Sequence, residues 1–223
     1  LTLILLTLLA ALADWIAVAR RAADPASRGA RTAEYVAKPL TMVFLIGAAL
    51  AIGHGHATTY LLVATVAALV LSLVGDVFLM LPEDVPLFFI LGLAAFLLAH
   101  VAYIAAFVRL HTHGGYAISL AVVGVILAGA MFATVGLPIR RAAAQEDPAL
   151  AGPVLAYVTV ISLMVIAAWW TGDLRIIPGA LLFALSDTMI GWTRFVRKDW
   201  ELDVPIIVTY HLAQVLLVLG LMR

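Results

Sequence analysis

The chain has 223 residues, of which 65% are hydrophobic and 12% are charged, whereas a soluble domain carries about 25% charged residues. Its formal net charge is zero, which gives no reason to expect a nucleic-acid partner. It contains no cysteine, so disulfides and thiol chemistry are excluded.

The apolar residues form blocks of about 20, long enough to cross a bilayer. They lack the strand-like alternation of a membrane β-barrel, so the spans are expected to be helices. We predict an all-α polytopic membrane protein, a single domain over 1–223 built as a bundle of eight transmembrane helices. The expected helices are 1–19, 36–53, 58–81, 86–108, 116–136, 153–170, 175–194 and 204–222.

Local signals support these boundaries. Five prolines are expected near helix starts, where a missing N–H costs least: Pro39, Pro86, Pro153, Pro178 and Pro205. The triplet at 11–13, Ala-Leu-Ala, is similar to a signal-peptidase site. We nevertheless expect 1–19 to be a retained first span. The short loops leave no room for a soluble domain, so any chemistry is expected among the helices.

The basic residues of the loops predict the orientation, because cytoplasmic loops are enriched in Lys and Arg. Loops after the odd-numbered spans contain nine such residues, which are Arg20, Arg21, Arg28, Arg31, Arg140, Arg141, Arg194, Arg197 and Lys198. The opposite side has three, Arg109, Arg175 and Arg223. We therefore expect both termini outside the cytoplasm, in a membrane that is the inner membrane of a bacterium.

Asp76 and Asp187 are isolated carboxylates within apolar runs, in "SLVGDVFLM" and "ALSDTMIGW". A charged residue at the centre of a span costs about 2.5–3.5 kcal/mol on insertion scales, so a functional role is the default hypothesis. The structural alternative is an interhelical hydrogen bond, worth about 0.6 kcal/mol on average. Two aspartates at matching depth favour a site over that alternative.

Other polar residues are expected at a similar depth, in the cytoplasmic half. They are Asp14, Lys38, Tyr157, Tyr210 and His211, with His100 and Tyr103 nearer the middle of the membrane. Each also has a structural explanation. Lys38 can extend to the interface with its charge in water, and His100 and Tyr103 can belong to an interior stripe with Phe96 and Phe107. The same caution applies to Tyr210 and His211.

A pair of buried carboxylates is suited to general acid–base catalysis, with one protonated as a donor and the other ionised to orient water. Competing chemistries lack their motifs. Gly-x-Ser-x-Gly is absent, and Ser186 precedes Asp187 without a flanking histidine. His-Glu-x-x-His is also absent.

Four loop histidines could in principle hold a metal on the opposite side, namely His54, His56, His111 and His113. Solvent-exposed loop histidines are the favoured interpretation.

The spacing of the polar residues hints at an internal repeat. Asp76 is followed 24 residues later by His100, in "HVAY", and Asp187 by His211, in "HLAQ". The two pairs are 111 residues apart, which would fit two parallel four-helix halves. The rest of the two halves matches poorly, so chance explains the pattern about as well as common ancestry.

Four stretches, in this order, resemble the YhhN family of eight-span membrane proteins, which includes lysoplasmalogenase. They are "KPL" at 38–40, "LVGDVFLM" at 73–80, "FLLAHVAY" at 96–103 and "ALLFALSDTMIG" at 180–191. The resemblance implies an alkenyl ether hydrolase that cleaves lysoplasmalogens, lysophospholipids of the membrane, to a fatty aldehyde and glycerophosphocholine or glycerophosphoethanolamine. It implies no metal or organic cofactor.

Matched position by position, the resemblance assigns Asp76 and Asp187 to catalysis. It adds Lys38, His100, Tyr103 and Ser186 as matching polar residues, with Lys38 suited to the substrate phosphate. Tyr210 and His211 join the substrate-binding candidates on their depth alone. Three alternatives stay open: a proton-coupled transporter, a non-catalytic lipid sensor or scaffold, and a hydrolase of another ether or ester lipid.

Overall fold

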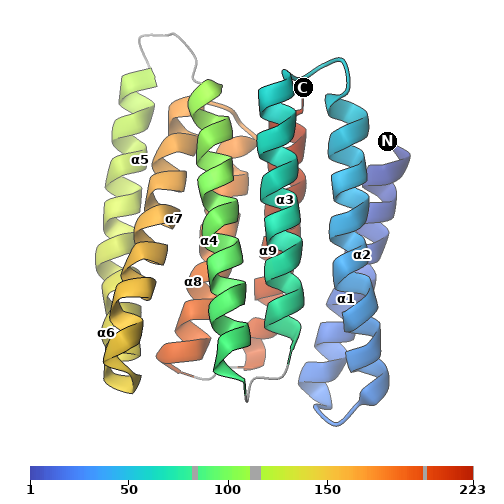
Figure 1. Ribbon diagram of the computed structural model, residues 1–223, viewed down its shortest axis with the longest axis vertical. Coiled ribbons are helices and arrows are strands. Elements are labelled where there is room, and N and C mark those ends of the chain that lie inside the picture. Colours follow the sequence, from blue (N-terminus) through green and yellow to red (C-terminus); the bar gives the residue numbers. More distant parts are fainter. Residues whose placement is uncertain (82–84, 111–116, 198–199, 223) are drawn as a thin grey trace.

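The computed structural model describes residues 1–81, 85–110, 117–197 and 200–222. Over these ranges the regular structure is helical, without strands (Figure 1). Eight helical segments among them are long and apolar enough to cross a membrane. The predicted fold class, a polytopic all-α membrane protein, is confirmed.

The elements follow one another along the chain as eight spans. They are α1 (Thr2–Ala23), α2 (Arg28–Gly53), α3 (Thr59–Met80), α4 (Pro86–Arg109), a fifth span built from α5 (Ala117–Met131), the π-helical turn η1 (Phe132–Gly136) and α6 (Leu137–Glu146), then α7 (Ala151–Thr171), α8 (Ile176–Phe195) and α9 (Asp203–Leu221). The single-turn 3₁₀ helices η2 (Pro148–Leu150) and η3 (Trp200–Leu202) precede α7 and α9.

The helices run side by side with alternating direction (Figure 1). Both chain ends lie at the upper end of the bundle in this view, and α8 and α9 lie behind α3 and α4. The ends of α1, α3, α6 and α8, with the starts of α2, α4, α7 and α9, lie at the lower end. This lower end is the one that the distribution of basic residues predicts to face the cytoplasm.

Helix starts agree with the sequence in several places. The Ser27 and Thr58 side chains accept hydrogen bonds from the backbone N–H groups of Ala30 and Leu61, which caps α2 and α3. Pro86 is the first residue of α4. Gly172 ends α7 in the left-handed conformation, with φ 65°, which glycine adopts without strain.

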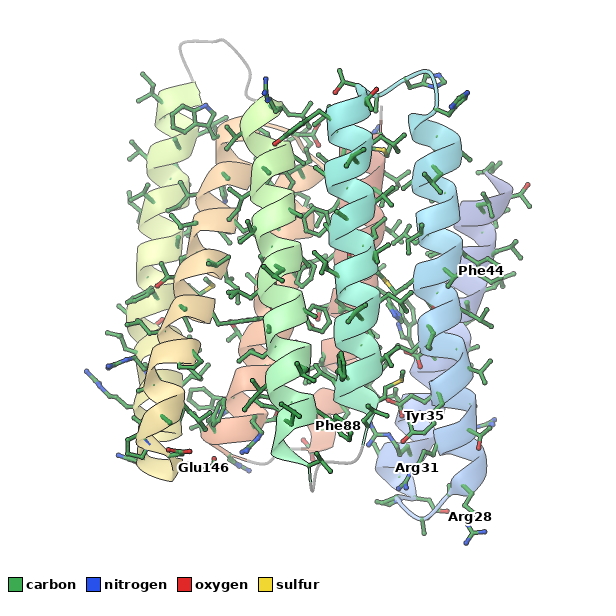
Figure 2. The ribbon with its side chains drawn as sticks, viewed as in Figure 1. Arg28, Arg31, Tyr35, Phe44, Phe88 and Glu146 are labelled. Carbon is green, nitrogen blue, oxygen red and sulfur yellow. The ribbon has the colours of Figure 1, made fainter. Side chains whose placement is uncertain are left out.

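Two predicted boundaries are wrong. Helix α2 begins at Arg28 rather than near 36, so Pro39 lies inside it. The early turns of α2 carry charged residues, including Arg28 and Arg31 at the lower end in Figure 2. The polarity of these turns is typical of a loop, which explains the wrong prediction. The Ser27 cap and the burial of Ala30 and Glu34 stabilise a helix that extends beyond the apolar layer.

The fifth span continues past its expected end near 136, through η1 and into α6. In η1 the N–H of Leu137 bonds to the carbonyl of Phe132, five residues earlier. The wider turn passes into α6 although Pro138 lacks an N–H. Ile139 and Ala143 are buried and tie α6 to the bundle.

The core runs along the axis of the bundle and joins small alanines to large aromatic rings. Tyr103, Phe107 and Phe183 are among its largest fully buried side chains. Exposed apolar side chains such as Val63, Ile118 and Ile126 cover the outside. An apolar exterior is expected of a surface that faces lipid.

Candidate active site

Asp187, on α8, lies in a buried cluster of polar side chains. The hydroxyl of Tyr157, on α7, donates a hydrogen bond of 2.5 Å to Asp187 Oδ2. His100 Nε2, on α4, lies 3.3 Å from the same oxygen without the alignment of a hydrogen bond. Three helices therefore meet at this carboxyl group.

The tautomer of His100 follows from its other ring nitrogen. Nδ1 lies 2.6 Å from the carbonyl oxygen of Phe96, which can only accept, so Nδ1 carries the hydrogen. In a neutral ring, Nε2 is then an acceptor that faces Asp187. Two acceptors in contact repel each other, so the contact favours one proton on either the carboxyl or the imidazole.

Asp76, on α3, has a parallel arrangement. The hydroxyl of Tyr210, on α9, donates a hydrogen bond of 2.7 Å to Asp76 Oδ2 and lies 3.5 Å from the sulfur of Met42. Asp76 is also within electrostatic range of the Lys38 ammonium. Each aspartate is thus held by a tyrosine from a different helix.

Aromatic rings connect the two carboxylates. The Phe183 ring lies 4.6 Å from the His100 ring and 5.5 Å from the Tyr210 ring, between centroids. The Asp187 carboxylate is within electrostatic range of Asp76. The structure therefore places the two aspartates within electrostatic range of each other, with the Phe183 ring between their partners His100 and Tyr210.

An apolar pocket of about 50 Å³ opens beside Asp187. Of its lining side chains, only Asp187, Tyr157 and Thr188 carry polar groups. The others include Leu93, Phe96, Met131, Val154, Ile161 and Ile190. Its volume suffices for a short apolar segment of a ligand, to which the pocket presents a carboxyl group.

A wider cavity of about 810 Å³ lies at the lower end of the bundle. Phe88 and Glu146, both labelled at that end in Figure 2, contribute to its lining. It shares four lining residues with the apolar pocket, namely Leu79, Phe89, Ile190 and Phe195. The two spaces therefore adjoin, and the wider cavity has charged side chains among its apolar lining.

One wall of the wider cavity is a chain of ion pairs. Glu34 accepts from Arg21 Nε at 2.6 Å and from Lys38 Nζ at 2.9 Å. Arg21 also reaches Asp203 at 3.3 Å. This chain joins α1, α2 and α9 at the mouth of the cavity.

The remaining predicted residues lie deeper or bond elsewhere. Tyr103 donates to Gln214 in the core, and Ser186 donates to the carbonyl of Ile206 at 3.1 Å. His211 Nδ1 accepts from Trp15 Nε1 at 3.1 Å. Neither the apolar pocket nor the wider cavity is lined by Asp76, His100, Tyr103, Ser186, Tyr210 or His211.

The sequence interpretation missed several partners. Tyr157 was placed at the right depth but not chosen for the site. Glu34 was assigned to a loop, although its spacing of four from Lys38 is that of a helical ion pair. Phe183 gave no signal, because an aromatic residue within an apolar span is ordinary core.

The described residues give no support to a metal site formed by the four loop histidines. His54 and His56 are exposed beyond the end of α2, and His111 and His113 lie outside the described residues. Over the described ranges, no three His, Asp or Glu side chains gather as a metal site would require.

Comparisons with known proteins find relatives of this chain. The lysoplasmalogenase of Mycobacterium tuberculosis (strain CDC 1551 / Oshkosh) is 35% identical over 185 residues, which cover 80% of this chain and 66% of that protein. Human Lysoplasmalogenase TMEM86B is 32% identical over 159 residues, covering 70% of this chain and 62% of the human protein. Mouse Lysoplasmalogenase TMEM86B is 30% identical over 174 residues, covering 78% and 68%.

The chain thus matches slightly less than two thirds of the mycobacterial and human proteins. No solved structure matches it. The model of the YhhN family matches residues 33–221, a range that contains both aspartates and their tyrosines. The chain belongs to the YhhN family.

Proposed function

We propose that the protein hydrolyses the vinyl ether bond of lysoplasmalogens, with Asp76 and Asp187 as an acid–base pair. The products are a fatty aldehyde and glycerophosphocholine or glycerophosphoethanolamine. One observation carries the proposal: two buried carboxyl groups, each bonded to a tyrosine, lie within electrostatic range, and one opens on an apolar pocket. The names of the relatives support the choice of substrate.

Asp187 is the proton donor in this proposal, because it lines the pocket and its contact with His100 favours a shared proton. Asp76 is the base that orients water, held in place by Tyr210. Tyr157 and His100 position the acid, and Phe183 keeps the space between the carboxyl groups apolar.

The reaction begins with transfer of the Asp187 proton to the outer carbon of the vinyl ether, which leaves an oxocarbenium ion. Water adds to the carbon attached to oxygen and gives its proton to Asp76, which yields a hemiacetal. Asp187 then takes the hemiacetal hydroxyl proton while Asp76 protonates the departing glycerol oxygen. Aldehyde and alcohol leave, and both carboxyl groups return to their starting states without a further proton donor.

The two adjoining spaces give each part of the lipid a place. A short segment of the alkenyl chain at the vinyl ether reaches the apolar pocket, and the polar glycerophosphate stays in the wider cavity. Lys38 lines that cavity, and beyond its bond to Glu34 its ammonium has two further hydrogens to offer. By the distribution of basic residues, this end faces the cytoplasm of a bacterium, in its inner membrane.

The experiment is to measure aldehyde release by the protein purified in detergent. A lysoplasmalogen is compared with its saturated-ether and acyl counterparts. Aldehyde from the vinyl ether alone supports the proposal. Absence of release, from folded protein that binds the lipid, contradicts it and favours a transporter or sensor. Release of fatty acid from the acyl lipid points instead to an esterase.

A further inference from the structure

Charged side chains line the wider cavity in two places. The wall on α1, α2 and α9 carries Arg21 and Lys38, but Glu34 and Asp203 are bonded to them. Two cations and two carboxylates make this wall formally neutral. Each of these two cations is therefore already bonded to a carboxylate.

A second set of charged residues lies at the ends of α8 and α6. Arg194 and Arg197 line the cavity there, and so do Glu146 and Asp147. Arg194 makes a two-pronged ion pair with Glu146, at 3.0 and 2.8 Å, and the pair is about half exposed. No ion pair joins Arg197 to another described residue. Its backbone N–H bonds to the carbonyl of Trp192 at 3.0 Å, which fixes the residue to the end of α8.

Arg194 also marks the boundary between the two spaces. Its guanidinium carbon lies 5.3 Å from the centre of the Phe89 ring and 5.0 Å from that of Phe195. Both rings line the wider cavity and the apolar pocket alike. A lipid with its chain in the pocket would therefore place its first polar groups beside this guanidinium.

We propose that Arg194 and Arg197 form a binding site for the phosphodiester of the lysophospholipid, at the α8 wall of the wider cavity. This assignment rests on the proposed function. Guanidinium groups match phosphate oxygens with paired hydrogen bonds. The volume of about 810 Å³ is within the usual range for sites of small ligands.

The test measures binding, so that it does not depend on catalysis. Radiolabelled 1-O-alkyl-glycerophosphocholine, a saturated ether without a vinyl group, is bound to the purified protein in a neutral detergent. 1-O-alkylglycerol, which has the same chain without the phosphodiester, is the second ligand. The variants are Arg197→Ala, Arg197→Lys and Arg194→Ala. Arg141→Ala is the matched control, since Arg141 is exposed on α6 and lines neither space.

We expect Arg197→Ala to raise the Kd for the phospholipid about tenfold and to leave the Kd for alkylglycerol unchanged. Arg197→Lys should recover part of the affinity, and Arg141→Ala should match the wild type. Wild-type affinity in both Arg197→Ala and Arg194→Ala, or equal losses for both ligands, would overturn the assignment. So would displacement of the phospholipid by inorganic phosphate at lower concentrations than by glycerophosphocholine, which would assign the pair to free phosphate.

The two proposals fail separately. A wild-type protein that binds the phospholipid through Arg197 but releases no aldehyde from any substrate disproves the hydrolase and keeps the phosphodiester site. If the wild-type protein releases aldehyde and the arginine variants bind the phospholipid as it does, the hydrolase is kept and the phosphodiester site is disproved.

Discussion

The hydroxyl of Tyr157, on α7, donates a hydrogen bond of 2.5 Å to the carboxyl group of Asp187, on α8. His100 approaches the same oxygen from α4. A carboxyl group in an apolar bundle is costly unless such partners stabilise it. Here the partners hold Asp187 at the wall of a pocket, where it can act on a bound chain.

Replacing either aspartate with asparagine should remove aldehyde release, because an amide can neither donate a proton to carbon nor accept one from water. Proton transfer by a positioned side chain contributes about 10²–10⁴-fold to a rate, and we expect losses of that order for Asp187→Asn and Asp76→Asn. The measurement is the turnover rate, with thermal unfolding to confirm folding. Asp24→Asn, at an exposed loop aspartate, is the control. Full activity in either site variant would disprove the paired mechanism.

Tyr157→Phe should lower kcat and stability together. It removes the hydroxyl that bonds to Asp187 and leaves the packing of the ring. A hydrogen bond between neutral groups is worth about 0.5–1.5 kcal/mol, and leaving a buried partner unsatisfied costs about 1–3 kcal/mol. We expect a lower midpoint of thermal unfolding and at least a tenfold loss of kcat. Tyr35→Phe is the comparison, since that hydroxyl bonds at the surface to the carbonyl of Met80, and it should leave kcat unchanged. A Tyr157→Phe protein with wild-type kcat would remove Tyr157 from the positioning of the acid.

The ion-pair chain at the mouth of the cavity gives a prediction about stability. Glu34→Ala removes the ion pairs of Glu34 with Lys38 and with Arg21. Arg21 retains its ion pair with Asp203. Breaking a buried pair costs about 3–5 kcal/mol, and we expect a loss near the lower end of that range. Glu146→Ala breaks an exposed pair and should cost about 0–1 kcal/mol. Unfolding in detergent with increasing denaturant measures both, and equal losses would contradict the account.

The π-helical turn gives another test of packing. An added Cβ at Gly136 would lie 2.3 Å from a methyl carbon of Val158. Gly136→Ala should therefore destabilise the protein by about 1–3 kcal/mol, as overpacking does. Gly129, on α5, has open space at the same position, so Gly129→Ala should be neutral or stabilising. The comparison uses thermal unfolding of the two variants, and a Gly136→Ala protein as stable as the wild type would show that α7 can move aside.

Much of the fold was predictable because a membrane imposes long apolar helices, and their number and order follow from hydropathy. The boundaries of α2 and of the fifth span were wrong for one shared reason. Both helices extend beyond the apolar layer, where hydropathy no longer distinguishes helix from loop. Pro39 was misplaced with the start of α2.

The site was predictable in part. Asp76 and Asp187 were conspicuous because a carboxylate in an apolar run has a high cost. The partners of the aspartates were less conspicuous, because a tyrosine such as Tyr157 is common in the core of any protein. Which side chains pair across helices also depends on the rotation of each helix about its axis, which the sequence does not reveal. The possible internal repeat stays an open hypothesis, and the Tyr103 hydroxyl bonds to Gln214, which has the same separation of 111 residues.

The most direct measurement is hydrolysis of a lysoplasmalogen by the purified protein in D₂O. The aldehyde is trapped at once as its oxime, and the mass of the oxime is measured by mass spectrometry. If an aspartate delivers a solvent-exchangeable proton to the outer vinyl carbon, the aldehyde must carry one deuterium at the carbon next to the carbonyl. Asp187→Asn should then release no labelled aldehyde. Aldehyde without deuterium, or labelled aldehyde from Asp187→Asn at the wild-type rate, would contradict acid catalysis at this site.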